Sequence, residues 1–482
     1  MSTRAFSALR SLNVRLSLPS RAIAVCVVDV SVFCTSLIQL QIHRTNPIYT
    51  SPQHPTRTKP FGSPQSRPLT MAPTTPIWSS QTHLQATTDQ TTTYTCPAET
   101  TPHIATILGF PSPCSTFPSL YTKTATEIID LAGAIAHFEP VRLHVRPTDQ
   151  AYATELLGTR LASHPDHELQ RITLVPCATN HVWVRDTGPV YVRQPGNAAQ
   201  RFAVDFGFCE WGNKTDELIY NSSADKTGAG SSSAGSEQED WPVMGAAERA
   251  ENTAFAATAL GLENGNAAVH GQAPVMMVQS RVRLEGGGIE IDGEGTFMAT
   301  ESSIIGPARN EGISREDIEA ELKRLLGVST FIWIPGRVGL DITDCHIDAE
   351  ARFIRPGVVV VCKPFPGCEA VYVEMYREMM EILEKAVDAQ GRRLEIHEIQ
   401  EPNPALVKGH VPGEEEAPAA SYVNFYFTNG GLVIPAFGDE EADRKALATL
   451  QALVPDREVR QVAVNALPRT GGVLHCVTQQ VM

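Results

Sequence analysis

Residues 423–437 read VNFYFTNGGLVIPAF, and this stretch sets the expectation for the fold. Aromatic and β-branched residues alternate on both sides of Asn-Gly-Gly, which is the pattern of two strands joined by a tight turn. Residues 438–455 follow with the apolar spacing of a helix, and Asp439 stands where a helix cap is expected. The stretch therefore predicts a module of one hairpin and one helix.

The same module recurs from about Cys96 onward. Three further hairpins are predicted around the turn sequences DTGP, DGEG and RPG, at residues 181–192, 288–300 and 351–362. Two further helices are predicted at residues 314–327 and 373–391, and both end at a glycine. A module repeated every ~60 to 70 residues predicts an α/β fold built by radial or stacked repetition, and not one open sheet.

Residues 1–95 differ in composition and are predicted to be a leader followed by a disordered segment, with Met71 as an alternative start. Residues 1–21 are rich in Arg and Ser and lack acids, which is typical of a mitochondrial transit peptide. Residues 22–42 have the length of a membrane span, but Asp29 disfavours stable membrane association. The expected location is the cytoplasm, or the mitochondrion if residues 1–40 act as a transit peptide. We expect a folded domain at residues 96–482, with a polar, disordered insertion near residues 221–240.

The charge balance disfavours a nucleic-acid partner. The chain has 39 basic and 54 acidic residues; eight basic and two acidic ones lie within residues 1–95, which leaves 31 and 52 for the rest. An acidic domain suits small cations, although acidity also serves solubility. The ten cysteines are scattered without a Cys-x-x-Cys pair, so we expect reduced thiols and neither a disulfide framework nor a structural zinc site.

Cys476, in the terminal stretch GGVLHCVTQQ (471–480), is a candidate nucleophile. Most buried cysteines are inert small hydrophobes, but the paired glycines and the polar residues around this one favour a functional role. Neighbouring side chains of an extended strand point to opposite faces. We therefore expect His475 to lie on the far face, and not to be the proton-handling partner of Cys476.

Candidate partners lie in three other polar stretches: WVRDTGP (183–189), LEGGGIEIDGEG (284–295) and DITDCHIDAEARF (341–353). His346 and Asp348 are two residues apart and would share one face of a strand, either as a surface pair or as a functional one. Zinc binding by Cys345, His346 and Asp348 is disfavoured because Cys345 would point away. Asp186 either caps a turn or joins Asp348 in binding a guanidinium from two sides. Glu285 is a third candidate anion, or a solvated residue.

These four stretches, in this order, resemble the motifs of the agmatine deiminase and bacterial-type peptidylarginine deiminase family of the guanidino-group-modifying superfamily. SYVNFYFTNGGLVIPAFGD and PDREV are also similar, so the resemblance spans roughly residues 97–480. It implies a five-bladed α/β propeller with a central site. It also implies that Cys476 is the nucleophile, His346 the general acid and base, and Asp186 and Asp348 the guanidinium-binding carboxylates. Trp183 and Glu285 are implied to lie near the substrate.

The resemblance implies hydrolysis of a guanidine without metal or cofactor, with agmatine and water giving N-carbamoylputrescine and ammonia. The expected partner is a small cationic guanidine, and formation of a homodimer is left open. The stretch VDFGFCEWGNK (204–214) and Cys345 depart from the family pattern. The alternatives that stay open are therefore deimination of peptidylarginine or another guanidine, amidino transfer to an amine, and a catalytically silent guanidine-binding protein.

Overall fold

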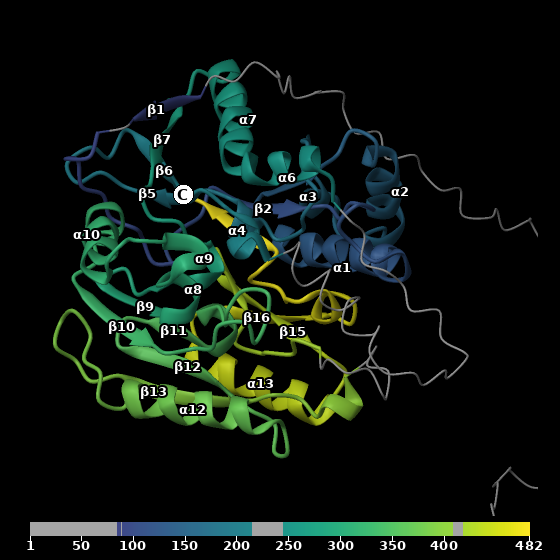
Figure 1. Ribbon diagram of the computed structural model, residues 1–482. Helices are drawn as coiled ribbons and strands as arrows, with labels where there is room; N and C mark the ends of the chain where they lie inside the picture. The colour runs from purple at the N-terminus through teal and green to yellow at the C-terminus, as the bar shows by residue number, and fades with distance from the viewer. Residues whose placement is uncertain (1–83, 88, 215–243, 408–417) are drawn as a thin grey trace, which may run out of the picture. The chain divides into compact units, whose positions relative to one another are not determined.

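The computed structural model describes residues 84–87, 89–214, 244–407 and 418–482, all within the unit Leu69–Met482 (Figure 1). In the described ranges the strands form five separate sheets of three or four strands each, so the fold is α/β with mixed sheets. The insertion predicted near residues 221–240 and residues 1–83 lie outside the described ranges.

Three of the sheets contain the predicted hairpins at residues 288–300, 351–362 and 423–437, which are confirmed. In each, two antiparallel strands are followed by helix and then by a third strand parallel to the second. The strands are β8 (Glu290–Ile291), β9 (Thr296–Thr300) and β10 (Thr330–Ile334); β11 (Ala351–Arg355), β12 (Val358–Lys363) and β13 (Glu395–Gln400); and β14 (Tyr426–Thr428), β15 (Gly431–Ala436) and β16 (Glu458–Ala463). The connecting helices are α8 (Glu301–Ile304), α9 (Pro307–Asn310), α10 (Arg315–Leu326), α12 (Ala370–Leu383) and α13 (Glu440–Leu453).

The other two sheets have the same spatial order, an antiparallel edge strand beside two parallel strands, with one additional strand; in the second of them the edge strand comes last in the chain. One contains β1 (Gln85–Thr87), β5 (Val190–Val192), β6 (Arg201–Asp205) and β7 (Val275–Gln279), with α6 (Ala246–Thr253) and α7 (Phe255–Val269) between β6 and β7. The other contains β2 (Ala105–Gly109), β3 (Val141–Val145), β4 (Ile172–Pro176) and β17 (Thr478–Val481), with α1 (Pro118–Ala136), α2 (Gln150–Arg160) and α3 (Asp166–Leu169). Parallel neighbours need a crossover connection, which the helices supply.

Both ends of the described chain take part in sheets. The C-terminal strand β17 runs antiparallel to β2, with Thr478 opposite Leu108, and Figure 1 shows this yellow strand beside β2. β1, which was predicted to belong to the leader, pairs in parallel with β7. The last strand therefore supplies the antiparallel partner that β2 would otherwise lack.

The predicted helix boundaries hold where a local cap fixes them. Ser314 accepts a hydrogen bond from the Asp317 amide at the start of α10, and Gly327 ends that helix with a φ of 70°. Asp439 caps α13 in the same way. The predicted end of the helix over residues 373–391 is wrong, because α12 ends at Leu383. The Asp388 carboxylate accepts the amides of Gln390 and Arg392 and holds a separate turn there.

The hairpin predicted at residues 181–192 is also wrong. Residues Val184–Thr187 form the one-turn helix α4, in which the Gly188 amide donates to the Val184 carbonyl. β5 begins only at Val190 and takes β6 as its antiparallel partner. The aliphatic and aromatic alternation continued through a segment whose backbone hydrogen bonds are helical. Among the described residues, no helix is long and apolar enough to span a bilayer.

Candidate active site

The candidate site is assembled from five loops, and each loop directly precedes the antiparallel edge strand of one sheet. Asp186 precedes β5, Glu285 precedes β8, His346 and Asp348 precede β11, Asn424 precedes β14, and Cys476 precedes β17. Equivalent loops of five sheets with the same strand order therefore bring together residues that lie almost 300 positions apart.

Asp186, on α4, is buried and oriented through both carboxylate oxygens. Oδ1 accepts a hydrogen bond from the Gly287 amide at 3.0 Å, and Oδ2 accepts one from Trp211 Nε1 at 2.9 Å. Burial raises the pKa of Asp186; the charge of His346 opposes this, and the charge of Asp348 adds to it. The positive charge near Asp186 is therefore too small to stabilise its ionised carboxylate fully. A bound cation would supply more.

His346 is held between two carboxylates. Its Nε2 lies 3.2 Å from Glu285 Oε2, and its Nδ1 lies 3.7 Å from Asp186 Oδ1. Burial alone would lower the pKa of His346, but the charge of Asp186 and the hydrogen bond to Glu285 raise it to about 9. The imidazole is therefore protonated at neutral pH and can donate a proton.

Glu285 is not a solvated residue. It is buried, and Arg309 Nε donates to its two oxygens at 2.9 and 2.7 Å. Arg309 NH1 in turn contacts Asp344 at 2.9 Å. The expected proximity of Glu285 to the other candidates is found, and its direct contact within the site is with His346.

Gly287, in the 3-10 turn η2 (Gly286–Gly288), lies where three of these groups converge. A Cβ atom at this position would lie 2.8 Å from both Asp186 Oδ1 and His346 Nδ1, and 3.1 Å from Asp348 Oδ2. A methyl group would therefore overlap with the atoms proposed to meet the substrate.

We expect Gly287→Ala to lower kcat/KM for the expected guanidine hydrolysis by about 100-fold. The added methyl group would displace Asp186, His346 and Asp348 at a cost of about 2–3 kcal/mol. Gly288→Ala is the matched control, because its Cβ would meet atoms no closer than 3.5 Å. Steady-state kinetics of the two purified variants measure the difference. Equal losses in both variants would contradict a specific role of the space beside Gly287.

Cys476 lies beside Asp348 and Asn424. Its thiol donates to Asp348 Oδ2 at 3.5 Å, and Asn424 Nδ2 donates to its sulfur at 3.2 Å. Burial raises the pKa of Cys476 well above its usual value, and the charges of Asp348 and Asp186 raise it further. The thiol is therefore protonated at neutral pH, and a cation placed between the two aspartates would favour the thiolate.

The expectation that His475 lies on a far face is wrong. His475 Nδ1 contacts Asp348 Oδ2 at 2.7 Å, so His475 and Cys476 approach the same carboxylate. Strand alternation does not apply here because β17 begins only at Thr478, and the Thr478 amide closes a turn onto the His475 carbonyl. Likewise, His346 and Asp348 lie at the start of the short helix α11 (Ile347–Glu350), and not on one face of a strand.

Trp183, the residue before α4, packs beside the cysteine loop. A Cβ at Gly472 would lie 2.7 Å from the Trp183 ring and 3.1 Å from the Cys476 sulfur. This glycine allows the indole to approach the loop, and Trp183 forms a wall next to Cys476.

Asn424, Trp211 and Glu99 also contact the site, and none of them was predicted from the sequence. Asn424 is the polar residue in the apolar run VNFYF, which was a usable signal. Trp211 lies in a left-handed turn in which Glu210, Trp211 and Asn213 have φ values of 53°, 51° and 61°. Asn adopts this conformation more easily than most residues, so Asn213 tolerates its positive φ.

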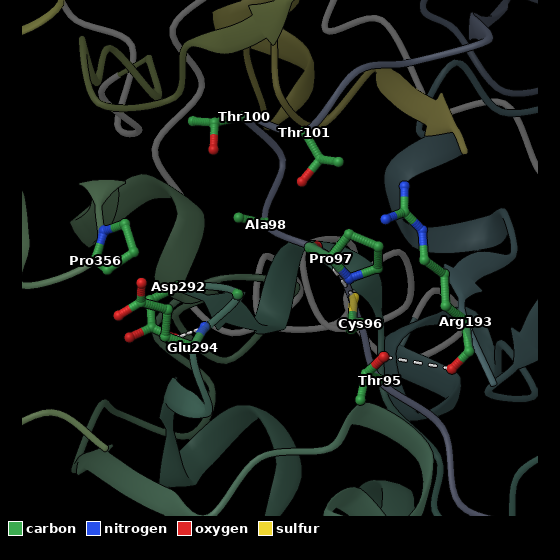
Figure 2. A pocket seen from close by; sticks show the side chains of 11 residues that line it. Thr95, Cys96, Pro97, Ala98, Thr100, Thr101, Arg193, Asp292, Glu294 and Pro356 are labelled. Atoms are coloured by element: carbon green, nitrogen blue, oxygen red, sulfur yellow. Dashed lines mark hydrogen bonds between the residues drawn. The ribbon is translucent and has the colours of Figure 1, made fainter. Parts of the chain in front are cut away.

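A separate cavity of about 300 Å³ lies at the other end of the hairpins β8–β9 and β11–β12 (Figure 2). Its lining includes Asp292, Glu294 and Pro356 of the hairpin turns, together with Arg193 and part of residues 95–101. None of the predicted site residues lines it. Within the described ranges, no group of three or more His, Cys, Asp and Glu side chains has an arrangement that could hold a metal ion.

Known proteins are similar over this region. The chain is 31% identical over 399 residues to the agmatine deiminase of Stutzerimonas stutzeri, covering 80% of this chain and 95% of the relative. It is 32% identical over 413 residues to the agmatine deiminase of Ectopseudomonas mendocina, covering 82% and 97%. The solved structure of Enterococcus faecalis agmatine deiminase matches with a TM-score of 0.65 and 25% identity, covering 82% of this chain and 99% of that one.

The α/β fold is thus shared with that deiminase. The sequence pattern of Porphyromonas-type peptidyl-arginine deiminases matches residues 95–481, which include all five site loops. The chain belongs to the Porphyromonas-type peptidyl-arginine deiminase family.

Proposed function

We propose that this protein hydrolyses agmatine to N-carbamoylputrescine and ammonia. One observation supports it above all: two buried carboxylates, Asp186 and Asp348, lie beside the Cys476 thiol and next to a protonated imidazole, with no side chain at Gly287 between them. The relatives from Stutzerimonas and Ectopseudomonas are named agmatine deiminases.

We assign guanidinium binding to the two aspartates. A guanidinium presents pairs of parallel N–H donors, and each carboxylate can accept such a pair. Bound between Asp186 and Asp348, the cation would offset the negative charge that raises the pKa of the thiol. Substrate binding and formation of the nucleophile are then coupled.

The reaction proceeds in two halves. The Cys476 sulfur bonds to the guanidinium carbon, His346 donates a proton to one terminal nitrogen, and the C–N bond breaks to release ammonia. Water then loses a proton to His346 and bonds to the same carbon of the thiouronium adduct. The C–S bond breaks and the remaining hydroxyl proton passes to solvent, which leaves the neutral ureido product and returns the thiolate. Glu285, fixed by Arg309, holds His346 in place through both halves.

The pH dependence should report His346. Because the pKa of His346 is raised to about 9, the acid form needed for ammonia release is present below that pH and is lost above it. We expect kcat for agmatine to fall on the alkaline side with a midpoint near pH 9, measured by ammonia release across a buffer series. Glu285→Gln removes one of the charges that raise this pKa, so its midpoint should be lower; an unshifted midpoint would speak against this assignment.

A substrate panel tests the proposed function. Agmatine, free arginine, arginine methyl ester and an arginyl peptide are compared by formation of the ureido product. The proposal expects agmatine to have the highest kcat/KM. A preference for the peptide would favour the second candidate function, peptidylarginine deimination, which the family's name supports. If no guanidine is consumed, the deiminase function is wrong and a guanidine-binding protein is favoured.

We further propose that the five sheets are the blades of a five-bladed propeller around this site. The same strand order in every sheet, and one site loop from each, support this arrangement. The eight described cysteines are free thiols, which agrees with the cytoplasmic location that we propose.

A further inference from the structure

A buried group of charges lies behind Asp348 and is not used in the mechanism above. Glu99 Oε2 lies 3.2 Å from NH2 of Arg185 and 3.2 Å from NH2 of Arg352. Glu99 Oε1 accepts the Phe427 amide at 3.0 Å. Glu290 forms an ion pair with Arg352 from the other side. Three donors, Arg185, Arg352 and the Phe427 amide, therefore hold the Glu99 carboxylate in place in addition to its contact with His475.

His475 connects Glu99 to the site. Its Nε2 contacts Glu99 Oε2 at 2.9 Å, and its Nδ1 contacts Asp348 Oδ2 at 2.7 Å. The His475 amide also donates to Asn424 Oδ1 at 2.9 Å, so both backbone and ring are fixed. The ring is 2% exposed, and water cannot substitute for either carboxylate.

The two carboxylates on either side of the His475 ring are ionised. Burial would raise the pKa of Glu99, but Arg352, His475 and Arg185 hold it well below its usual value. Burial opposes ionisation of Asp348 too, but the hydrogen bond from His475 lowers its pKa. Ionised carboxylates only accept hydrogen bonds, whereas a neutral imidazole has one N–H. Each ring nitrogen of His475 therefore lies against one of these acceptors, and the contact with Asp348 requires a hydrogen on Nδ1.

We propose that Glu99 and His475 are positioning residues, which fix the orientation of Asp348 so that it can receive the guanidinium beside Cys476. This inference rests on the proposed function. Asp348 lies on a short helix of one turn, which by itself does not fix a side chain. The ring pins Oδ2 at the carboxylate edge that also faces the Cys476 sulfur. The carboxylate then has one orientation when the substrate enters, which lowers the entropy cost of forming the paired contact.

The test compares the variants His475→Asn and His475→Gln, which both place a side-chain amide at this position. The side-chain nitrogen of Asn corresponds to Nδ1 of His475 and can still donate to Asp348, whereas that of Gln corresponds to Nε2 and can reach only Glu99. The readout is the ratio of two rates of Cys476 alkylation, by cationic chloroacetamidine and by neutral iodoacetamide. A general loss of structure changes the alkylation rates with both reagents. A misplaced Asp348 changes mainly the rate with the cationic chloroacetamidine, and so changes the ratio.

We expect wild-type protein to react at least about 10-fold faster with the cation. His475→Gln should lower the ratio by about 10-fold, and His475→Asn should keep it within about 3-fold of wild type. Glu99→Gln should lower it by about 5-fold. Glu290→Gln is the matched control, since it removes a buried carboxylate from Arg352 without touching His475, and its ratio should match wild type.

The outcomes separate this inference from the proposed function. Equal ratios for His475→Asn and His475→Gln, or a wild-type ratio in Glu99→Gln, overturn the positioning role while the deiminase function stands. If both His475 variants fail to fold, as judged by thermal melting, the comparison of Glu99→Gln with Glu290→Gln decides. A wild-type ratio near 1 overturns the proposed function together with the inference.

Discussion

Cys476→Ala is expected to lower the rate of ammonia release from agmatine by at least about 10⁴-fold, because no other thiol among the described residues contacts Asp348 to form the covalent adduct. Asp186, Asp348 and His346 remain in place, so the variant should still bind agmatine, which calorimetry can measure. Ammonia release and ureido formation report the loss of turnover.

Cys177→Ala is the control for removing a thiol. Cys177 is buried, burial raises its pKa to about 12, and it has no contact with the site residues. This variant should keep activity within about 2-fold of wild type. Ammonia release by Cys476→Ala at a rate close to wild type would rule out the cysteine-dependent mechanism.

Removal of residues 478–482 is expected to lower kcat/KM by at least about 10³-fold although Cys476 is retained. The deletion removes β17 and exposes β2, and it also removes Gln480, which binds Arg185 at 2.7 Å. The Arg185 amide donates to the Cys476 carbonyl at 3.2 Å, so the cysteine loop loses its support. The loss of buried side chains such as Val481 should lower Tm by about 5 °C or more.

Full-length Cys476→Ala separates the two effects of this deletion. This variant should be inactive with a Tm near that of wild type, whereas the deletion should lower both the activity and the Tm. Calorimetric melting and kinetics on the same samples test this. A truncated protein that kept its activity would show that β17 is not needed to hold the nucleophile.

Much of the fold could be predicted because the repeated module is local. The turn Asn-Gly-Gly and its flanking strands lie within fifteen residues. Ser314 and Asp439 each cap the helix that directly follows them in the sequence. The helix over residues 373–391 was overextended because a pattern of apolar spacing does not reveal that Asp388 forms its own turn. The hairpin at residues 181–192 failed for a similar reason: alternation is shared by strands and by short segments that turn.

Four of the residues gathered at the candidate site were predicted from the sequence, but their contacts were not. Cys476, His346, Asp186 and Asp348 were identified by residue type and by resemblance to a family, and the structure brings these four close together. The orientation of His475 was wrong because a strand conformation was assumed where the chain turns. Glu99 carried no local signal, since a glutamate in a loop is usually solvated.

The sequence alone determined three of the four predicted hairpins, the two capped helices and the types of residue that the chemistry requires, since each depends on neighbours a few positions away. Only the tertiary structure decided how those residues act on one another. His475 meets Glu99 across 376 positions and Asp348 across 127. Burial of these charges, with water excluded, fixes which groups are ionised and which oxygen faces the thiol. No local pattern contains that information, because five distant loops supply it together.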